Sequence, residues 1–542
     1  MVCSSLAFAL ASLAVGPQVT PAPTEPPRPH IVLVMADDFG FSDLGCYGGE
    51  IATPHLDALA AGGLRFTQFY NTARCCSTRA SLLTGLYPHQ AGIGHMVNDR
   101  GHDGYRGDLN DRCVTIAEVL RAAGYRTAMV GKWHVTKFIA KDGRKDGWPR
   151  QRGFDEFFGT IHGAGSYFAP NTLTDGNTFL ESVPDDFYYT DAIGERAAVI
   201  VRAHEGTAPL FLYVPFSSPH WPLHARPADI AAQRGRYDGG WDELRRARLA
   251  RQIELGIVPA DTTLTPRDRG EPAWEDAEHH AWQASRMEVY AAQVVAMDRA
   301  VGTLRAALAD SGKLANTLFL FLADNGGCAE EINAQWGHSP SIPRTTRDGR
   351  PVQKGNDPKI APGPEDTYQS YGRAWANASN TPFRRYKHWV HEGGIASPLI
   401  AHWPAGIAAR GELRHEPAHL IDVMPTCVAL ANAEYPTTVK DKAIQPMEGV
   451  SLLPLFADGA GNALAPRDLY FEHEGNRAVR RGPWKLVAAG ERGAFELYDM
   501  RADRTEQHDL AAHEPERAAE LAAAWQAWAE RCAVLPLNPK AR

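Results

Sequence analysis

The chain has 542 residues, enough for two to four domains at about 150 residues each, and its 44% hydrophobic and 22% charged residues are typical of a globular protein. A formal net charge of -8 excludes a global basic field that would attract nucleic acid, so any anion-binding site must be built locally. The eight cysteines form no CxxC pair, which argues against a disulfide scaffold and against a zinc knuckle.

Residues 1–27 have the order of an export signal followed by a linker. An apolar run from Leu6 to Val15 precedes a Pro-rich stretch, although no basic residue comes before the run. The run is too short to span a bilayer, and no later segment has the ~18 consecutive apolar residues that a span needs. We therefore expect a periplasmic or secreted protein with no membrane span; the alternative is a disordered N-terminal tail.

Short apolar runs rich in Val, Ile, Leu and Phe predict strands that are buried on both faces, as in a parallel sheet. They lie at residues 30–40, 125–135, 209–224 and 317–327. Helical patterns fall between them, at residues 53–63, 115–124 and 285–312. Alternating helices and strands predict an α/β fold with an open sheet between helices.

All four predicted strands end in polar residues. Ligands of such sheets bind beyond the carboxyl ends of the strands. The residues at these ends are Asp37 and Asp38, Lys132 and His134, His220, and Asp324 and Asn325. Each alone is explained by a cap or turn, such as an Asn-Gly turn in "ADNGG". Four together predict one shared site.

The acidic strand ends offer only oxygen ligands. Three carboxylates and one amide suit Ca²⁺ or Mg²⁺ better than zinc, and the ligand set is Asp37, Asp38, Asp324 and Asn325. Two-zinc phosphatases of comparable architecture need several histidines, and "ADNGG" supplies none.

Basic side chains are available around this cation site. A tetrahedral anionic group requires fixed positive charges, for which Arg79, Lys132 and Lys387 are candidates; the alternative for each is a solvated surface charge. His134 and His220 suit general acid–base chemistry near neutral pH.

Two adjacent cysteines precede an arginine in "TARCCSTRASLLTGLYP", residues 72–88. Residues from Arg79 onward are predicted to be helical, so Cys75 lies just before a helix N-terminus, where negative charge on a nucleophile is favoured. The cysteine-phosphatase loop needs five residues between cysteine and arginine. Only three residues separate Cys75 from Arg79, and only two separate Cys76 from Arg79, which excludes that family.

The pattern C-x-[PSA]-x-R followed by "xxLLTGxYP" resembles the signature of type I sulfatases, within the alkaline phosphatase superfamily. Ser77 stands where proline is commonest in that signature and is an accepted variant. Further blocks resemble the family in its own order: "VMADDFGFSDLGCYGG", "GYRTAMVGKWHV", "QRGFDEFFG", "SSPHWPLHA", "LADNGG" and "YKHWVHEGGIASPLIAHWP". The tail resembles the C-terminal subdomain of bacterial arylsulfatases, so the resemblance runs from about residue 28 to about 535.

The resemblance implies a sulfuric ester hydrolase that acts on aryl sulfates or on another small-molecule or carbohydrate sulfate ester. A formylglycine-generating enzyme would convert Cys75 to Cα-formylglycine, and Cys76 would be a bystander. One Ca²⁺ would be held by Asp37, Asp38, Asp324 and Asn325, with the modified Cys75 also facing it. Arg79 would hold the formylglycine hydrate, and Lys132 and Lys387 would bind sulfate oxygens. His220 or Lys387 would assist the leaving group, and His134 would take the proton that releases sulfate.

The implied architecture is a large mixed, mainly parallel sheet between helices, as in alkaline phosphatase, with a smaller C-terminal α+β subdomain. We place the catalytic domain at residues 28–460 and the subdomain, with an antiparallel sheet and a terminal helix, at residues 461–542. The long polar segment 330–382 is expected to roof the site, lined by Trp336, His338, Tyr371 and Trp375.

Two alternatives remain. A phosphonate or phosphate ester hydrolase of the same superfamily would use similar chemistry, because sulfate and phosphate are nearly isosteric. A non-catalytic, calcium-stabilised binding protein would be expected to lack at least one of Cys75, Arg79, His134 or His220, and all four are present.

Overall fold

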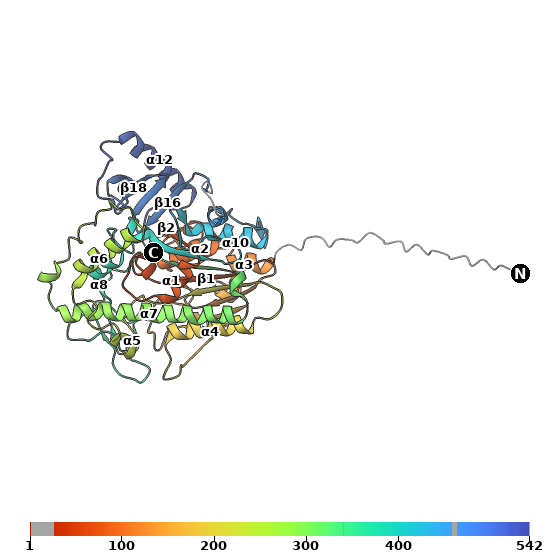
Figure 1. Cartoon of the computed structure of the whole chain (residues 1–542), viewed down its shortest axis with the longest axis horizontal. Coiled ribbons are helices and arrows are strands. Elements are labelled where there is room, and N and C mark those ends of the chain that lie inside the picture. The colour runs from red at the N-terminus through yellow and green to blue at the C-terminus, as the bar shows by residue number, and fades with distance from the viewer. Residues whose placement is uncertain (2–26, 340, 458–462, 541–542) are drawn as a thin grey trace.

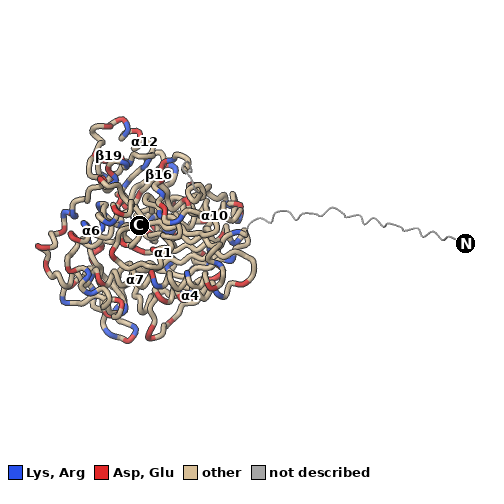
Figure 2. Tube along the Cα trace, viewed as in Figure 1, with Lys and Arg blue, Asp and Glu red and all other residues tan. Residues whose placement is uncertain are grey.

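A computed structural model describes residues 1, 27–339, 341–457 and 463–540 (Figure 1). The expected export segment, residues 1–27, lies outside this description except at its two ends. Within the described part of the chain, no helix is long and apolar enough to cross a bilayer. Basic and acidic residues are interspersed over the trace (Figure 2), in keeping with the small net charge of -8.

The centre of the molecule is an eleven-stranded sheet. Its strands, in spatial order, are β12 (Glu412–Arg414), β2 (Leu64–Tyr70), β11 (Ala396–His402), β8 (Thr317–Ala323), β1 (His30–Ala36), β7 (Leu210–Pro215), β3 (Arg126–Val130), β4 (Glu156–Thr160), β5 (Leu173–Asp175) and β6 (Thr178–Phe179), with β13 (Ala418–His419) also paired to β2. The run β8-β1-β7-β3-β4 is parallel, while β11 is antiparallel to both of its neighbours. The expected mixed, mainly parallel sheet and its four predicted strands are confirmed.

Both faces of the sheet are covered because the strands are apolar on both sides. Along β1, Val32 and Val34 belong to one hydrophobic core, and Leu33 and Met35 belong to the other. The first core packs under α1 (Pro54–Ala61), α4 (Tyr189–Ala203), α5 (Pro227–Ala231), α6 (Gly240–Glu254), α7 (His280–Asp310) and α8 (Gly372–Ser379). The second packs under α2 (Cys75–Thr84), α3 (Ile116–Ala122), α10 (Val423–Ala431), α11 (Leu453–Phe456) and α12 (Pro515–Arg531).

The C-terminal segment forms a four-stranded antiparallel sheet. Its strands are β16 (Asp468–His473), β17 (Asn476–Arg481), β18 (Trp484–Ala488) and β19 (Phe495–Asp499). The sheet and α12 lie together on one side of the large sheet, at the top of Figure 1, opposite α4 and α7. Small elements complete the fold: the strand pairs β9 (Gln353–Lys354) with β10 (Thr367–Tyr368) and β14 (Thr438–Val439) with β15 (Lys442–Ala443), and α9 (Glu392–Ile395).

The C-terminal sheet and the large domain share one hydrophobic core. The indole ring of Trp528, on α12, stacks on Tyr470 of β16 with ring centroids 5.2 Å apart. It also meets the ring of Tyr87, which follows α2, edge to face with centroids 5.0 Å apart. Aromatic pairs of this kind stabilise beyond their buried area, so Trp528 joins the two parts of the chain.

Two local expectations differ from the structure. The helix expected from Arg79 onward begins at Cys75, because burial of Cys75–Thr84 outweighs the weak helix propensity of its first residues. In the 330–382 segment, Trp375 is buried in the core against Trp241, with ring centroids 5.5 Å apart, and Tyr371 stacks on Tyr290 at 4.4 Å. Trp375 is 0% exposed, and Tyr371 borders a cavity of about 10 Å³ that it shares with Asp38, whereas Trp336 stays 37% exposed.

Replacing Trp528 with alanine is expected to lower the free energy of unfolding by about 3–5 kcal/mol, because it opens a cavity in the shared core. Thermal unfolding monitored by circular dichroism would measure this, with the exposed Trp336→Ala as the matched control. Equal midpoints for the two variants would show that the C-terminal sheet does not depend on this contact.

Candidate active site

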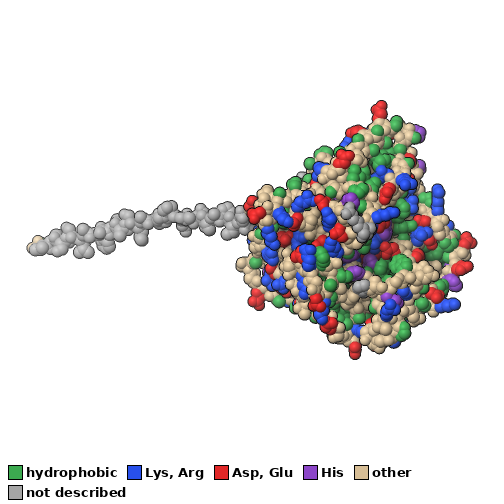
Figure 3. Space-filling model, turned by 180° about the vertical axis from the view of Figure 1, so that it is seen from behind, with side chains coloured by type: hydrophobic (Ala, Val, Ile, Leu, Met, Phe, Trp, Pro, Cys, Tyr) green, Lys and Arg blue, Asp and Glu red, His purple; other side chains and the backbone are tan. Residues whose placement is uncertain are grey.

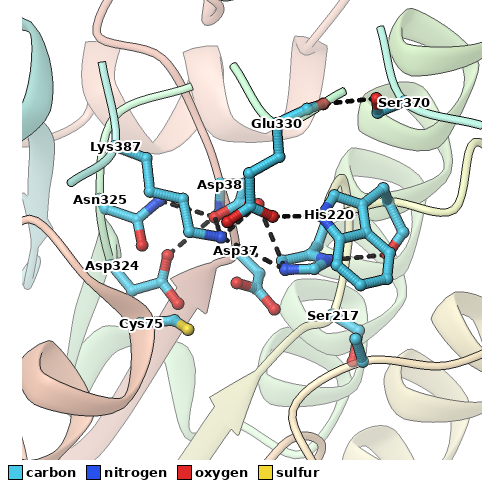
Figure 4. Close-up of polar contacts among 12 residues, drawn as sticks. Asp37, Asp38, Cys75, Ser217, His220, Asp324, Asn325, Glu330, Ser370 and Lys387 are labelled. Atoms are coloured by element: carbon cyan, nitrogen blue, oxygen red, sulfur yellow. Dashed lines mark hydrogen bonds and ion pairs between the residues drawn. The ribbon is translucent and has the colours of Figure 1, made fainter. Parts of the chain in front are cut away.

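The residues predicted at the strand ends meet at one edge of the large sheet (Figure 4). Asp37 and Asp38 follow β1, and Asp324 and Asn325 follow β8, which pairs with β1 in parallel. Lys132 and His134 follow β3, and His220 follows β7. Cys75 and Arg79 come from α2, beyond the end of β2, and Lys387 precedes α9. All of the predicted site residues are therefore brought together.

The acidic residues form a buried cluster rich in oxygen atoms. The backbone amide of Asp38 donates to Asp324 Oδ1 at 3.1 Å, and Asn325 Nδ2 donates to Asp38 Oδ1 at 2.7 Å. Asp37, Cys75 and Asp324 offer ligand atoms that lie within 4.8 Å of one another. Within the described residues, Asp37 Oδ1 and Asn325 Oδ1 are buried and accept no hydrogen bond.

Unpaired buried oxygens are costly, and a hard cation is the partner that would satisfy both of them. The donor set therefore fits Ca²⁺ or Mg²⁺.

Each carboxylate also has a buried basic partner. Lys132 Nζ donates to Asp37 Oδ2 at 2.5 Å. Arg79 Nη2 donates to Asp324 Oδ2 at 2.7 Å and lies 3.7 Å from Asp37 Oδ2. Lys387 Nζ lies 2.7 Å from Asp38 Oδ1. Removing one partner of such a buried ion pair destabilises the protein, because it leaves an uncompensated buried charge.

The neighbours act differently on two adjacent carboxyl groups. Burial, together with the nearby Asp324, raises the pKa of Asp37 well above its usual range despite Lys132 and Arg79. Burial also opposes ionisation of Asp38, but His220 and Lys387 outweigh it and lower the pKa of that carboxyl. Asp37 is thus the carboxylate whose ionised form still lacks compensating positive charge.

Cys75 is the first residue of α2 and is only 2% exposed. Its Sγ lies 3.4 Å from His134 Nδ1. A hydrogen bond with Cys76, followed by the charge of Lys132 and the neighbouring His134, lowers the pKa of the Cys75 thiol well below its usual range, against the effect of burial. By contrast, burial raises the pKa of Cys76. Only one of the adjacent cysteines therefore sits where negative charge is stabilised.

The two histidines of the site are neutral near pH 7. Burial lowers the pKa of His134 to about 3 and that of His220 to about 4. His220 Nδ1 donates to the Trp221 carbonyl at 2.6 Å, so its Nε2 carries the lone pair. That Nε2 lies 3.4 Å from Lys387 Nζ, which places a basic nitrogen beside an ammonium group.

Glu330 is a site residue that sequence reasoning missed. Its carboxylate accepts from Trp221 Nε1 at 2.7 Å and lies 3.2 Å from Arg74 Nη1, beside His220 and Lys387 in Figure 4. Lys387, His388 and Arg74 hold the pKa of Glu330 well below its usual range although burial opposes this. No motif marks Glu330, because its partners come from distant parts of the chain.

Comparison with known proteins agrees with the family resemblance seen in the sequence motifs. The family model described as Sulfatase matches residues 29–433. An arylsulfatase of Klebsiella aerogenes is 35% identical over 78% of this chain and 91% of its own length. An uncharacterized sulfatase of Schizosaccharomyces pombe is 32% identical over 92% and 93% of the two chains. Human arylsulfatase A is 31% identical over 90% of this chain and 80% of its own length.

Solved structures share the fold. The crystal structure of Ps i-CgsB in complex with k-i-k-neocarrahexaose has a TM-score of 0.65 and 23% identity, covering 92% of each chain. The structure of BT4656 in complex with its substrate D-glucosamine-2-N,6-O-disulfate has a TM-score of 0.62 and 19% identity, covering 94% of this chain and 99% of the other.

Arg79→Gln is expected to lower the free energy of unfolding of chelator-treated protein by about 3–5 kcal/mol, because it leaves Asp324 and Asp37 without their shared cation. Arg501→Gln is the matched control, since Arg501 is largely exposed beside Asp499 and exposed pairs contribute about 0–1 kcal/mol. Denaturant unfolding of both variants measures the difference, and equal losses would contradict this account of the charge cluster.

Proposed function

The chain belongs to the sulfatase family, and we propose that it hydrolyses sulfate esters, most directly aryl sulfates, with a formylglycine derived from Cys75 as the nucleophile. The observation that carries the proposal is the position of Cys75. It is the first residue of a buried helix and lies beside His134. Its sulfur and the nearest carboxylate oxygens of Asp37 and Asp324 lie within 4.8 Å of one another.

We assign the cation as one Ca²⁺ per chain, held by Asp37, Asp38, Asp324 and Asn325, with residue 75 facing it. The unsatisfied oxygens of Asp37 and Asn325 support this assignment, and the all-oxygen side-chain set favours a hard cation over zinc. When bound, the ion supplies positive charge that stabilises the transferring sulfuryl group.

The residues around position 75 have distinct proposed tasks. The aldehyde hydrate of formylglycine supplies two hydroxyl groups on one carbon, one for attack on sulfur and one for the later release of sulfate. Arg79 holds the hydrate, while Lys132 and Lys387 bind sulfate oxygens as preorganised charges. His134 is neutral and 3.4 Å from Cys75 Sγ, so it is available to take the proton that accompanies release of sulfate.

Departure of the alcohol requires a proton on the leaving oxygen. Lys387 Nζ and His220 Nε2 lie 3.4 Å apart, so an ammonium donor stands beside a nitrogen with a free lone pair. We propose that Lys387 or His220 delivers the proton to the leaving group and that the other restores it.

Burial of Cys75 bears on its maturation. A side chain that is 2% exposed is not accessible in the folded protein, so a formylglycine-generating enzyme would have to act before folding is complete. We propose this enzyme as the maturation partner, export to the periplasm or medium, and residues 28–460 as the catalytic domain with residues 461–542 as its supporting subdomain.

A phosphonate or phosphate ester hydrolase of the same superfamily is the second candidate, because the basic residues would accept either tetrahedral anion. The 35% identity with an arylsulfatase favours sulfate. Turnover of an aryl sulfate compared with the matching aryl phosphonate ester separates the two, and a higher kcat/KM for the phosphonate would reverse our assignment.

Protein co-produced with a formylglycine-generating enzyme is expected to lose about 18 mass units in the peptide that contains residues 72–79, since a thiol and hydrogen are replaced by a carbonyl oxygen. Peptide mass spectrometry locates the change. Cys75→Ala should abolish aryl sulfate hydrolysis, and Cys76→Ala, the matched control, should retain it. An active protein with unmodified Cys75 would disprove the nucleophile assignment.

Removing divalent cations with a chelator is expected to abolish activity and to lower the midpoint of thermal unfolding, and Ca²⁺ should restore both better than Zn²⁺. Asn325→Leu should raise the Ca²⁺ concentration needed, because it removes an unsatisfied oxygen from the cluster. The exposed Asn333→Leu is its control. Full activity of chelated, metal-free protein would contradict the calcium assignment.

A further inference from the structure

We propose a second metal site, for a transition-metal dication such as Zn²⁺, formed by His388, His473 and Glu474. Nothing in the proposed sulfatase chemistry uses these residues. His473 is the last residue of β16 and Glu474 follows it in the turn to β17, whereas His388 lies in the segment that leads into α9. The site would thus join the C-terminal sheet to the segment that carries Lys387.

The three side chains are close enough to share one ion. Their ligand atoms lie within 4.8 Å of one another. Glu474 Oε2 is 2.9 Å from His388 Nδ1, and Glu474 Oε1 is 3.6 Å from His473 Nε2. His95 stacks on His473 with ring centroids 5.5 Å apart, and its Nε2 lies 3.2 Å from Glu474 Oε1. One carboxylate therefore stands among three imidazole nitrogens.

His473 supplies the independent observation that points to a ligand. Its side chain is 0% exposed, and within the described residues neither ring nitrogen makes a hydrogen bond. A buried imidazole normally has a partner for its polar atoms, because leaving them unpaired costs free energy. The Nε2 atom faces Glu474, so a metal ion between the two would use its lone pair.

His388 is oriented as metal-bound histidines are. While its Nδ1 faces Glu474, its Nε2 lies 3.0 Å from Glu330 Oε1. Glu330 is held in turn by Trp221 Nε1 at 2.7 Å. A carboxylate that accepts from the outer nitrogen of a histidine fixes the ring and makes the inner nitrogen a better ligand.

Imidazole donors select the kind of ion. Two or three nitrogens with one carboxylate suit zinc and its neighbours in the transition series, whereas calcium prefers oxygen ligands throughout. The cluster is therefore distinct in chemistry from the oxygen-rich centre at Asp37. Histidine side chains also reach the surface around the middle of the face seen in Figure 3.

Two guanidinium groups oppose a cation at this place. Arg74 Nη1 lies 3.0 Å from His388 Nδ1 and 2.5 Å from His388 Nε2, and Arg100 Nη2 lies 2.9 Å from His95 Nε2. The charge of Arg74 is offset by Glu330 at 3.2 Å, and Glu474 adds a second negative charge. Metal binding would have to displace Arg74 from the ring nitrogens of His388, so we expect weaker affinity than in a cysteine-rich zinc site.

The test uses the full chain, first saturated with Ca²⁺ so that the oxygen-rich centre is filled, and then titrated with Zn²⁺ by isothermal calorimetry. We expect one further ion per chain. Co²⁺ in place of Zn²⁺ should give a visible absorption band typical of nitrogen ligands. Absence of Zn²⁺ binding to the calcium-saturated protein would overturn the proposal, whether or not the protein hydrolyses sulfate esters.

Variants locate the ion. His473→Ala and Glu474→Gln should each abolish Zn²⁺ binding, and Glu330→Gln should weaken it about 10–100-fold through loss of the outer contact to His388. His508→Ala is the control, because His508 is exposed beside Asp503. Circular dichroism checks folding; should His473→Ala fail to fold, His388→Gln replaces it, because the His388 side chain is 27% exposed. Unchanged binding in folded ligand variants would disprove the site.

Discussion

Compensation of buried negative charge is the constraint on which the site depends. Three carboxylates stand at the ends of two neighbouring parallel strands, where water is excluded and an isolated ionised group is costly. Arg79, Lys132 and Lys387 supply the opposing charges, each from a different element. The large sheet must therefore form, with α2 and the segment before α9 in place, before any of these carboxylates is tolerated.

The compensation is incomplete, and this is what makes the cluster a candidate cation site. Asp37 Oδ1 and Asn325 Oδ1 stay without hydrogen-bond partners within the described residues, and the pKa of Asp37 remains raised. A fully paired cluster would be a structural network with no further capacity for ligands. Here the residual negative charge lies beside Cys75, so the same imbalance that favours a cation places it next to the residue that we assign as nucleophile precursor.

Most of the site was predictable because it follows from strand ends. Asp37, Asp324 and Lys132 could be placed together from local patterns, since carboxyl ends of parallel strands share one edge. Lys387 was a candidate from its charge alone, and its spacing in the sequence did not tie it to the strand ends. Glu330 and the side chains around His473 were not predictable, because their contacts join segments far apart in the chain. The start of α2 and the place of Trp375 were missed because burial, which sequence patterns report poorly, decided them.

The C-terminal subdomain is coupled to the active site by adjacency in the chain. Lys387 pairs with Asp38, and the next residue, His388, contacts Glu474 on the turn between β16 and β17. Glu330 lies between them. Its Oε1 is 3.0 Å from His388 Nε2, and the charge of Lys387 lowers the pKa of its carboxyl group. The contact between His388 and Glu474 therefore ties the β16–β17 turn to the segment that carries the ammonium group paired with Asp38. The C-terminal subdomain supplies no residue to the oxygen-rich cluster. Through His388 it can still influence the position of Lys387, the ammonium group that pairs with Asp38.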